Sequence, residues 1–120
     1  MRLNHLDLQV SDMYASVRIF VEVFGLDLLS NPRSSSMAIL SDGADFVLVL
    51  QRMKNEGDRY PRGFHLGFYV DTVAEVNDAK ARAEAHGLDV SDVITGNRGT
   101  LIYCELPDRI LVEVNARSVN

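Results

Sequence analysis

The chain carries the same pattern twice, and this repeat constrains its fold more than any other feature. A strand-like stretch with alternating residues begins around His5, and a second one begins around His65. Each then continues through a helix-like stretch that stops at a glycine, Gly25 in the first copy and Gly87 in the second. Self-similarity at this length marks a structural unit that is built more than once. We therefore expect two related modules, each presenting a histidine at the same place.

Both opening strands alternate strictly between apolar and other residues, which is the period of a half-buried strand. Their apolar faces are predicted to point into a core. The opposite faces carry His5, Asp7 and Gln9 in the first copy and His65, Gly67 and Tyr69 in the second. The parity of the first strand is thus reproduced in the second.

Each copy is predicted to have the element order β-α-β-β-β, so the fold class is α+β. The first helix follows a cap at Ser11 or Asp12, and the second follows Thr72 with a capping box. The first helix is expected to cover the sheet with Met13, Val17, Phe20, Val21 and Phe24. The remaining strands are expected near 27–30, 37–41 and 46–51, and near 89–93, 101–105 and 109–115. Residues 1–51 form module one, the polar stretch 52–63 is the linker, and residues 64–117 form module two of one domain, 1–120.

Composition excludes several classes of function. The 120 residues include 12 basic and 17 acidic side chains, for a net charge of −5, and no basic cluster suits nucleic acid. No apolar run approaches the roughly 20 residues that span a bilayer, and no signal-peptide pattern is seen, so we expect a cytoplasmic protein without a membrane partner. The single cysteine, Cys104, forbids an internal disulfide. Any bound metal must therefore use His, Asp or Glu.

A carboxylate in the last predicted strand supplies a third candidate ligand beside the two histidines. Glu113 alternates with the apolar residues of its strand and so lies on the face that the core does not use. Two imidazoles and one carboxylate suit a divalent first-row metal and leave positions open for water or substrate. His5, His65 and Glu113 form such a site if the fold brings them together, although a lone strand histidine is ordinarily just a polar residue.

At this point the chain resembles the vicinal oxygen chelate superfamily, which includes glyoxalase I, fosfomycin-resistance enzymes, extradiol dioxygenases and bleomycin-resistance proteins. The resemblance covers nearly the whole chain. It rests on four segments in order: Leu3-Asn4-His5-Leu6, Val23-Phe24-Gly25-Leu26, His65 opening the second repeat, and Leu106-Pro107-Asp108-Arg109-Ile110-Leu111-Val112-Glu113. The last of these is similar to the family's Asp-Pro-Asp-Gly-x-x-x-Glu segment.

This resemblance implies two βαβββ modules that form a cup-shaped mixed sheet with helices on the outside. It also implies that His5, His65 and Glu113 hold a divalent metal ion, with Fe, Mn, Ni and Zn all open. Chains of this size in the family complete the cup as homodimers, so His5 comes from either the same subunit as His65 and Glu113 or the partner subunit.

Departures from the family's motifs narrow the choice among the branches of the superfamily. Glyoxalase I has a fourth ligand late in its first module, where this chain has Val49. Fosfomycin-resistance enzymes place a phosphonate-binding arginine beyond the final glutamate, where only Arg117 stands here. Extradiol dioxygenases have a tyrosine that Tyr103 matches, but their acid–base histidine has no counterpart near Ile94. A three-ligand site is therefore expected.

Further candidate residues lie on the strand faces of the proposed ligands or, for Asn97 and Arg98, in the loop 96–99. Tyr103 is a candidate to hydrogen-bond a metal-bound oxygen or to transfer a proton. The alternative is a structural tyrosine whose ring packs in the sheet. Asp7 is a candidate base or supporting group for His5, or else a solvated charge at the rim. Four candidate substrate contacts are Gln9, Tyr69, Asn97 and Arg98. Cys104 follows Tyr103 in the strand and so points to the opposite face of the sheet, and it is predicted to be a small core residue.

The sequence thus predicts a metal-dependent enzyme acting on a small molecule that chelates through adjacent oxygens. Lyase, isomerase, transferase and ring-cleaving dioxygenase chemistry all stay open. The alternative is a metal-free protein of the bleomycin-resistance type, which sequesters a drug or metabolite. A degenerate member without any ligand is a third possibility.

Overall fold

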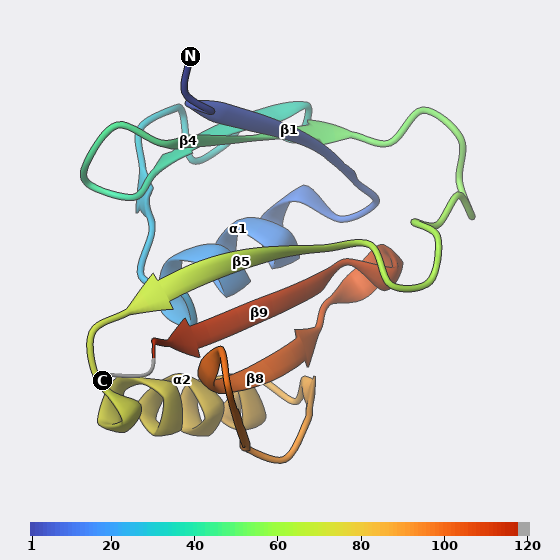
Figure 1. Cartoon of the computed structure of the whole chain (residues 1–120). Helices are drawn as coiled ribbons and strands as arrows, with labels where there is room; N and C mark the ends of the chain where they lie inside the picture. Colours follow the sequence, from blue (N-terminus) through green and yellow to red (C-terminus); the bar gives the residue numbers. More distant parts are fainter. Residues whose placement is uncertain (118–120) are drawn as a thin grey trace. The chain divides into compact units, whose positions relative to one another are not determined.

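The computed structural model describes residues 1–117, which fall into two compact units. Unit 1 is Met1–Asp58, and unit 2 begins at Arg59. The division lies inside the polar stretch 52–63. Each unit contains its own mixed sheet and one long helix, so the chain is an α+β protein, as its sequence predicts (Figure 1).

Unit 1 has the predicted β-α-β-β-β order. Its elements are β1 (His5–Val10), α1 (Met13–Glu22), β2 (Asp27–Leu28), β3 (Met37–Ser41) and β4 (Val47–Arg52). The strands lie in the order β1-β4-β3-β2, with β1 and β4 parallel and the other pairs antiparallel. The helix contacts β2, β3 and β4, which places the core between α1 and one face of this sheet.

Unit 2 repeats this arrangement with one additional strand. Its elements are β5 (His65–Val70), α2 (Val73–Ala85), β6 (Asp89–Val90), β7 (Ile94–Gly96), β8 (Gly99–Glu105), a 3-10 turn at Pro107–Arg109, and β9 (Leu111–Ala116). The strand order is β5-β9-β8-β6, and β7 pairs with β8. Figure 1 shows β5, β9 and β8 side by side, and α2 packs on them from one side. Again one pair, β5 and β9, is parallel.

Both helices begin where capping residues predict. The Asp12 side chain accepts a hydrogen bond from Ala15 N at 3.1 Å, and the Thr72 hydroxyl accepts one from Glu75 N at 3.2 Å. Beyond the helices, Gly25 and Gly87 adopt φ of 75° and 77°, the left-handed conformation that suits glycine at a helix end.

The face that α1 buries differs from the predicted one. Met13 and Phe20 are buried as expected, but Val17, Val21 and Phe24 are only half-buried. Ser16, Ile19 and Val23 are buried in their place. Apolar residues occur on more than one side of this helix, so its periodicity does not select a single stripe.

The strand predicted at 89–93 is also corrected by the structure. It is shorter, Asp89–Val90, and the chain forms the separate strand β7 at Ile94–Gly96. All three residues of β7 are exposed, so no alternation in hydropathy marks them. The strand exists because it pairs antiparallel with β8 across the turn at Asn97 and Arg98.

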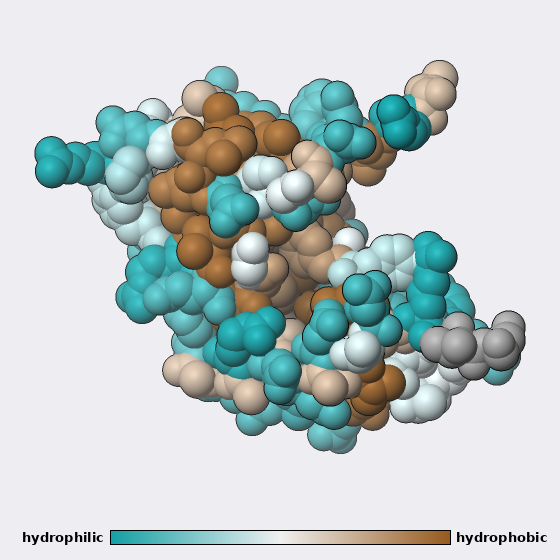
Figure 2. Space-filling view, turned by 90° about the vertical axis from the view of Figure 1, so that its left-hand side faces the viewer, coloured by the Kyte–Doolittle hydropathy of each residue, from teal (hydrophilic) through white to brown (hydrophobic). Residues whose placement is uncertain are grey.

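Hydrophobic side chains also reach the surface. On the side of the molecule seen in Figure 2 they form a broad area bordered by hydrophilic residues. Exposed large hydrophobic residues include Leu3, Tyr14, Leu29, Met37, Tyr69, Val93 and Ile94. Neither helix among the described residues has the length and hydropathy needed to cross a bilayer.

Candidate metal and substrate site

The sheet of unit 2 has one face covered by α2 and one open face. Register places His65 opposite Leu111, Gly67 opposite Glu113, and Tyr103 opposite Glu113 from the other side. Side chains at paired positions share a face. Val112 and Val114 on β9 are buried, whereas Glu113 between them is only half-buried. His65, Glu113 and Tyr103 therefore meet on the open face of one sheet.

The ring of His65 is oriented by a backbone carbonyl. Its Nδ1 lies 2.9 Å from Gly63 O, and because a carbonyl only accepts, Nδ1 carries the proton. This bond leaves Nε2 as the ring nitrogen that can bind a metal ion. A hydrogen bond to the second ring nitrogen is the usual way in which proteins orient a metal-binding histidine.

The carboxylate of Glu113 occupies space that a glycine leaves open. A Cβ on Gly67 would lie 3.5 Å from Glu113 Oε2 and 3.7 Å from its Cβ. The carboxylate thus lies over the neighbouring strand, on the side where His65 projects. A larger residue than alanine at position 67 would compete with it for this space.

Tyr103 contacts both of these residues. Its ring stands edge-on to the His65 ring, with centroids 5.8 Å apart and an interplanar angle of 89°. The phenol donates a hydrogen bond to the Glu113 carboxylate, which raises the phenol pKa above its ordinary value. Burial and the negative charge of Glu113 raise this pKa further, whereas the positive charge of Arg98 lowers it. These contacts therefore favour the neutral form of the phenol over the phenolate.

These residues fit a divalent metal ion as a partial set of ligands. An imidazole nitrogen with a fixed tautomer and a half-buried carboxylate are donors that first-row divalent metals accept. Within residues 1–58, and likewise within residues 59–117, no three His, Cys, Asp or Glu side chains gather closely enough to hold an ion. Of the three predicted ligands, unit 2 contains His65 and Glu113.

Unit 1 presents His5 and Asp7 on the open face of its own sheet. His5 Nδ1 lies 2.7 Å from Asn4 Oδ1, so this histidine too has a partner at Nδ1. Asp7 Oδ2 accepts a hydrogen bond from Gln51 Nε2 at 2.7 Å, and Gln51 lies opposite Gln9 in the register. Gln51 was not predicted as a site residue, although its alternation with Leu50 places it on the same face as Asp7.

Comparison of the two registers shows where the repeat loses its symmetry. Val49 lies opposite Asp7 in unit 1, and Glu113 lies opposite Gly67 in unit 2. Val49 is thus the counterpart of Glu113, as its sequence position predicts. A valine has no donor atom, so unit 1 contributes no ligand at this position.

The predicted substrate contacts lie in different parts of the sheets. Tyr69 is 54% exposed on β5, and the guanidinium of Arg117 lies 4.0 Å from the centroid of its ring. Asn97 and Arg98 form the exposed turn between β7 and β8. Of these two, Arg98 is close enough to act electrostatically on Tyr103.

Cys104 is a core residue, as its parity predicts. It is fully buried, and burial raises the pKa of its thiol to about 11, with the Lys80 charge opposing this effect. A thiol with this pKa is not a nucleophile at neutral pH.

The fold and the half-exposed His–Tyr–Glu cluster define an α+β protein with a repeated module and a candidate metal site. A model of the Glyoxalase/Bleomycin resistance protein/Dioxygenase superfamily matches residues 2–114. The chain therefore belongs to this superfamily, the vicinal oxygen chelate superfamily that its sequence resembles. None of the curated proteins matches the chain.

Solved structures with the same fold include several members of this superfamily. A possible glyoxalase from Bacillus cereus is 28% identical, with a TM-score of 0.82 over 97% of this chain and 99% of the other. The fosfomycin resistance protein FosX from Listeria monocytogenes, complexed with Mn(II) and sulfate, is 20% identical, with a TM-score of 0.79 over 98% and 91%. Lactoylglutathione lyase from Agrobacterium tumefaciens is 23% identical, with a TM-score of 0.73 over 96% and 92%. The last two likenesses show the fold alone.

Proposed function

We propose that the protein is a metal-dependent enzyme whose ligands are His5, His65 and Glu113. The observation that carries this proposal is the cluster on the open face of unit 2, where the oriented ring of His65 and the carboxylate of Glu113 both contact Tyr103. Because unit 2 offers only two of the proposed ligands, we assign the third to His5, whose Nδ1, like that of His65, lies against an oxygen atom. The Mn(II) complex of FosX supports a divalent ion in this fold.

The bound ion would act as a Lewis acid toward a small substrate that chelates through adjacent oxygens. The neutral phenol of Tyr103 would donate a hydrogen bond or a proton to a substrate oxygen, since its raised pKa keeps it protonated. Asp7, held by Gln51, is the proposed base. Gln9, Tyr69, Asn97 and Arg98 are the proposed substrate contacts.

We propose a homodimer as the functional form. The large hydrophobic residues that remain exposed, among them Met37 at 43% and Leu29 at 63%, support this proposal because burying apolar surface against a partner is favourable. His5 then comes from the same subunit as His65 and Glu113 or from the partner subunit. A cytoplasmic location is proposed with it. Sedimentation at micromolar concentration tests the dimer, and a monomer would contradict it.

Metal content is the decisive measurement. Untagged protein is dialysed against each divalent ion at slight excess, and bound metal is compared with His5→Ala, His65→Ala and Glu113→Ala. His86→Gln is the matched control, since His86 lies at the end of α2 and on neither open face. We expect about one ion per site in the wild type and in the control, and little in the three variants. Equal uptake by all five proteins, or none by the wild type, would contradict the proposal.

The reaction is then identified with a small panel of substrates. Fosfomycin, lactoylglutathione and catechols represent transferase, lyase and dioxygenase chemistry. Binding of bleomycin by a metal-free wild type would instead favour the alternative function, sequestration of a drug or metabolite.

A further inference from the structure

Both backbone groups of Tyr103 are held by one residue, Ser91, at the end of the short pairing between β6 and β8. Ser91 N donates to Tyr103 O at 2.9 Å, and Tyr103 N donates to the Ser91 hydroxyl at 2.9 Å. The first bond continues the antiparallel register of Val90 with Cys104. In the second, a side chain takes the place that a backbone carbonyl has in a regular sheet. Ser91 therefore completes the ladder with its hydroxyl.

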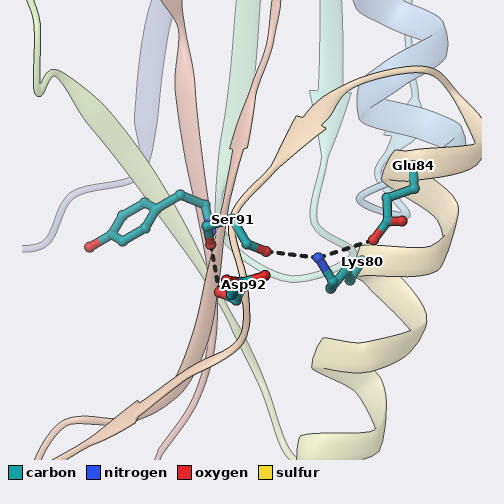
Figure 3. A network of polar contacts seen from close by, with 5 residues as sticks. Lys80, Glu84, Ser91 and Asp92 are labelled. Atoms are coloured by element: carbon teal, nitrogen blue, oxygen red, sulfur yellow. Dashed lines mark hydrogen bonds and ion pairs between the residues drawn. The ribbon is translucent and has the colours of Figure 1, made fainter.

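The carbonyl of Ser91 accepts from Lys80 and not from Tyr103 N. Lys80 Nζ donates to Ser91 O at 2.8 Å and forms an ion pair with Glu84 at 3.0 Å, with its side chain 27% exposed. Figure 3 shows Lys80 between Glu84 on the helix and Ser91 on the adjoining strand segment. The Ser91 hydroxyl in turn donates to Asp92 O at 2.9 Å. Every polar group of Ser91 thus has a partner.

This arrangement determines how Tyr103 faces Glu113. Adjacent strands of an antiparallel pair exchange backbone hydrogen bonds only at alternate positions. Since the N–H and C=O of Tyr103 both point toward Ser91, they point away from β9, so Tyr103 and Glu113 form a non-hydrogen-bonded pair. In such pairs the side chains approach more closely than in hydrogen-bonded ones. The contact of phenol and carboxylate follows from this geometry.

We propose that Ser91, with its carbonyl held by Lys80, is the positioning residue for Tyr103. It fixes the backbone of β8 so that the phenol meets the Glu113 carboxylate. The proposal rests on the proposed function only in giving Tyr103 a chemical role; the positioning itself is a property of unit 2 alone. Alanine at position 91 would remove the hydroxyl that accepts from Tyr103 N, while the carbonyl of residue 91 stays directed toward Lys80.

The test uses tyrosine labelled with ¹³C at Cζ, whose NMR signal reports the hydrogen bonding of the phenol. The chain has four tyrosines, and Tyr103→Phe assigns the relevant signal. The full-length protein is studied at neutral pH without added metal, so the result does not depend on metal binding or activity. Ser91→Ala is compared with Ser91→Thr, which keeps the hydroxyl. Thr72→Ala, which removes the cap of α2 outside this network, is the control for a general loss of stability.

We expect Ser91→Ala to shift the Tyr103 signal toward that of an exposed tyrosine while the other three signals stay unchanged. Ser91→Thr should restore the wild-type signal. An unchanged Tyr103 signal in Ser91→Ala, or an equal shift in Thr72→Ala, would overturn the proposal. If Ser91→Ala does not fold, Lys80→Met replaces it, with a smaller shift in the same direction expected and no shift as the contrary result.

Discussion

The phenol of Tyr103 and the carboxylate of Glu113 face each other on neighbouring antiparallel strands and share a hydrogen bond. This bond favours the neutral form of the phenol, since ionisation would place two negative charges together. The ring of Tyr103 also stands edge-on to the ring of His65, whose Nδ1 is bound to a carbonyl. The pair therefore connects the proposed metal ligands to a proton donor.

Glu113→Gln is expected to lower the pKa of Tyr103 toward its ordinary value of 10.0, because the negative charge that raises it is lost. Absorbance titration of the phenolate detects the change, with Tyr103→Phe identifying the relevant tyrosine. The effect on stability has a defined sign. A group with a raised folded-state pKa stabilises fully below its unfolded pKa, so any advantage of the wild type over Tyr103→Phe should shrink as pH rises through the raised value. An unchanged titration in Glu113→Gln would show that the carboxylate does not govern the phenol.

Arg98→Gln is expected to move the same pKa in the opposite direction. The positive charge of Arg98 lowers the phenol pKa, so its removal should raise this pKa above that of the wild type. Arg98→Lys keeps the charge and serves as the matched control. Addition of salt should weaken the difference, because Arg98 is exposed and its charge is screened. A titration identical in all three proteins would place Arg98 away from Tyr103.

Two glycines of unit 2 are expected to respond very differently to alanine. A Cβ on Gly67 would make ordinary contacts with Glu113, so Gly67→Ala should change the free energy of unfolding by no more than about 1 kcal/mol. Gly99 has φ of 121°, and a Cβ there would collide with the carbonyl oxygen of Ala116, so Gly99→Ala should cost about 3 kcal/mol or more. Urea unfolding measures both.

The same position tests the site as well as the fold. Gly67→Val should displace the Glu113 carboxylate and weaken divalent metal binding by about tenfold or more, with Gly67→Ala as the control. Equal metal affinity in the two variants would show that the space over Gly67 is not needed by the carboxylate.

The modules and their elements were predictable from local signals. Alternation in the opening strands and the caps at Asp12 and Thr72 depend on nearby residues, and the structure has them where expected. The strand β7 (Ile94–Gly96) was missed because pairing with β8, not burial, creates it. The buried stripe of α1 was assigned wrongly because apolar residues surround that helix, and only packing against the sheet selects one side.

The site was predictable to a lesser extent. Parity alone places His65, Glu113 and Tyr103 on the face that the core does not use. Their mutual contacts depend on the register of β5, β9 and β8, which residue spacing does not specify. The roles of Gly67 and Ser91 were missed for the same reason. Gly67 leaves room for the Glu113 carboxylate, and Ser91 binds the backbone of Tyr103, and both roles depend on strand register.

In the turn before β9, this chain has Arg109 where the family's Asp-Pro-Asp-Gly-x-x-x-Glu segment has glycine. Arg109 adopts φ of 64°, directly after Asp108 at 68°. A side chain in this left-handed conformation costs roughly 1–2 kcal/mol, and asparagine and aspartate tolerate it better than arginine. Part of the gain from glycine is lost to the greater freedom of the unfolded chain. Arg109→Gly should therefore stabilise the protein by about 0.5–1 kcal/mol.

Urea unfolding of Arg109→Gly, Arg109→Ala and Asp108→Gly separates conformation from side-chain contacts. Arg109→Ala removes the guanidinium but keeps the Cβ, so it should bring no gain. Asp108→Gly should gain less than Arg109→Gly, because aspartate already tolerates a positive φ. If Arg109→Gly is no more stable than Arg109→Ala, the arginine side chain must contribute contacts that outweigh the strain of its backbone.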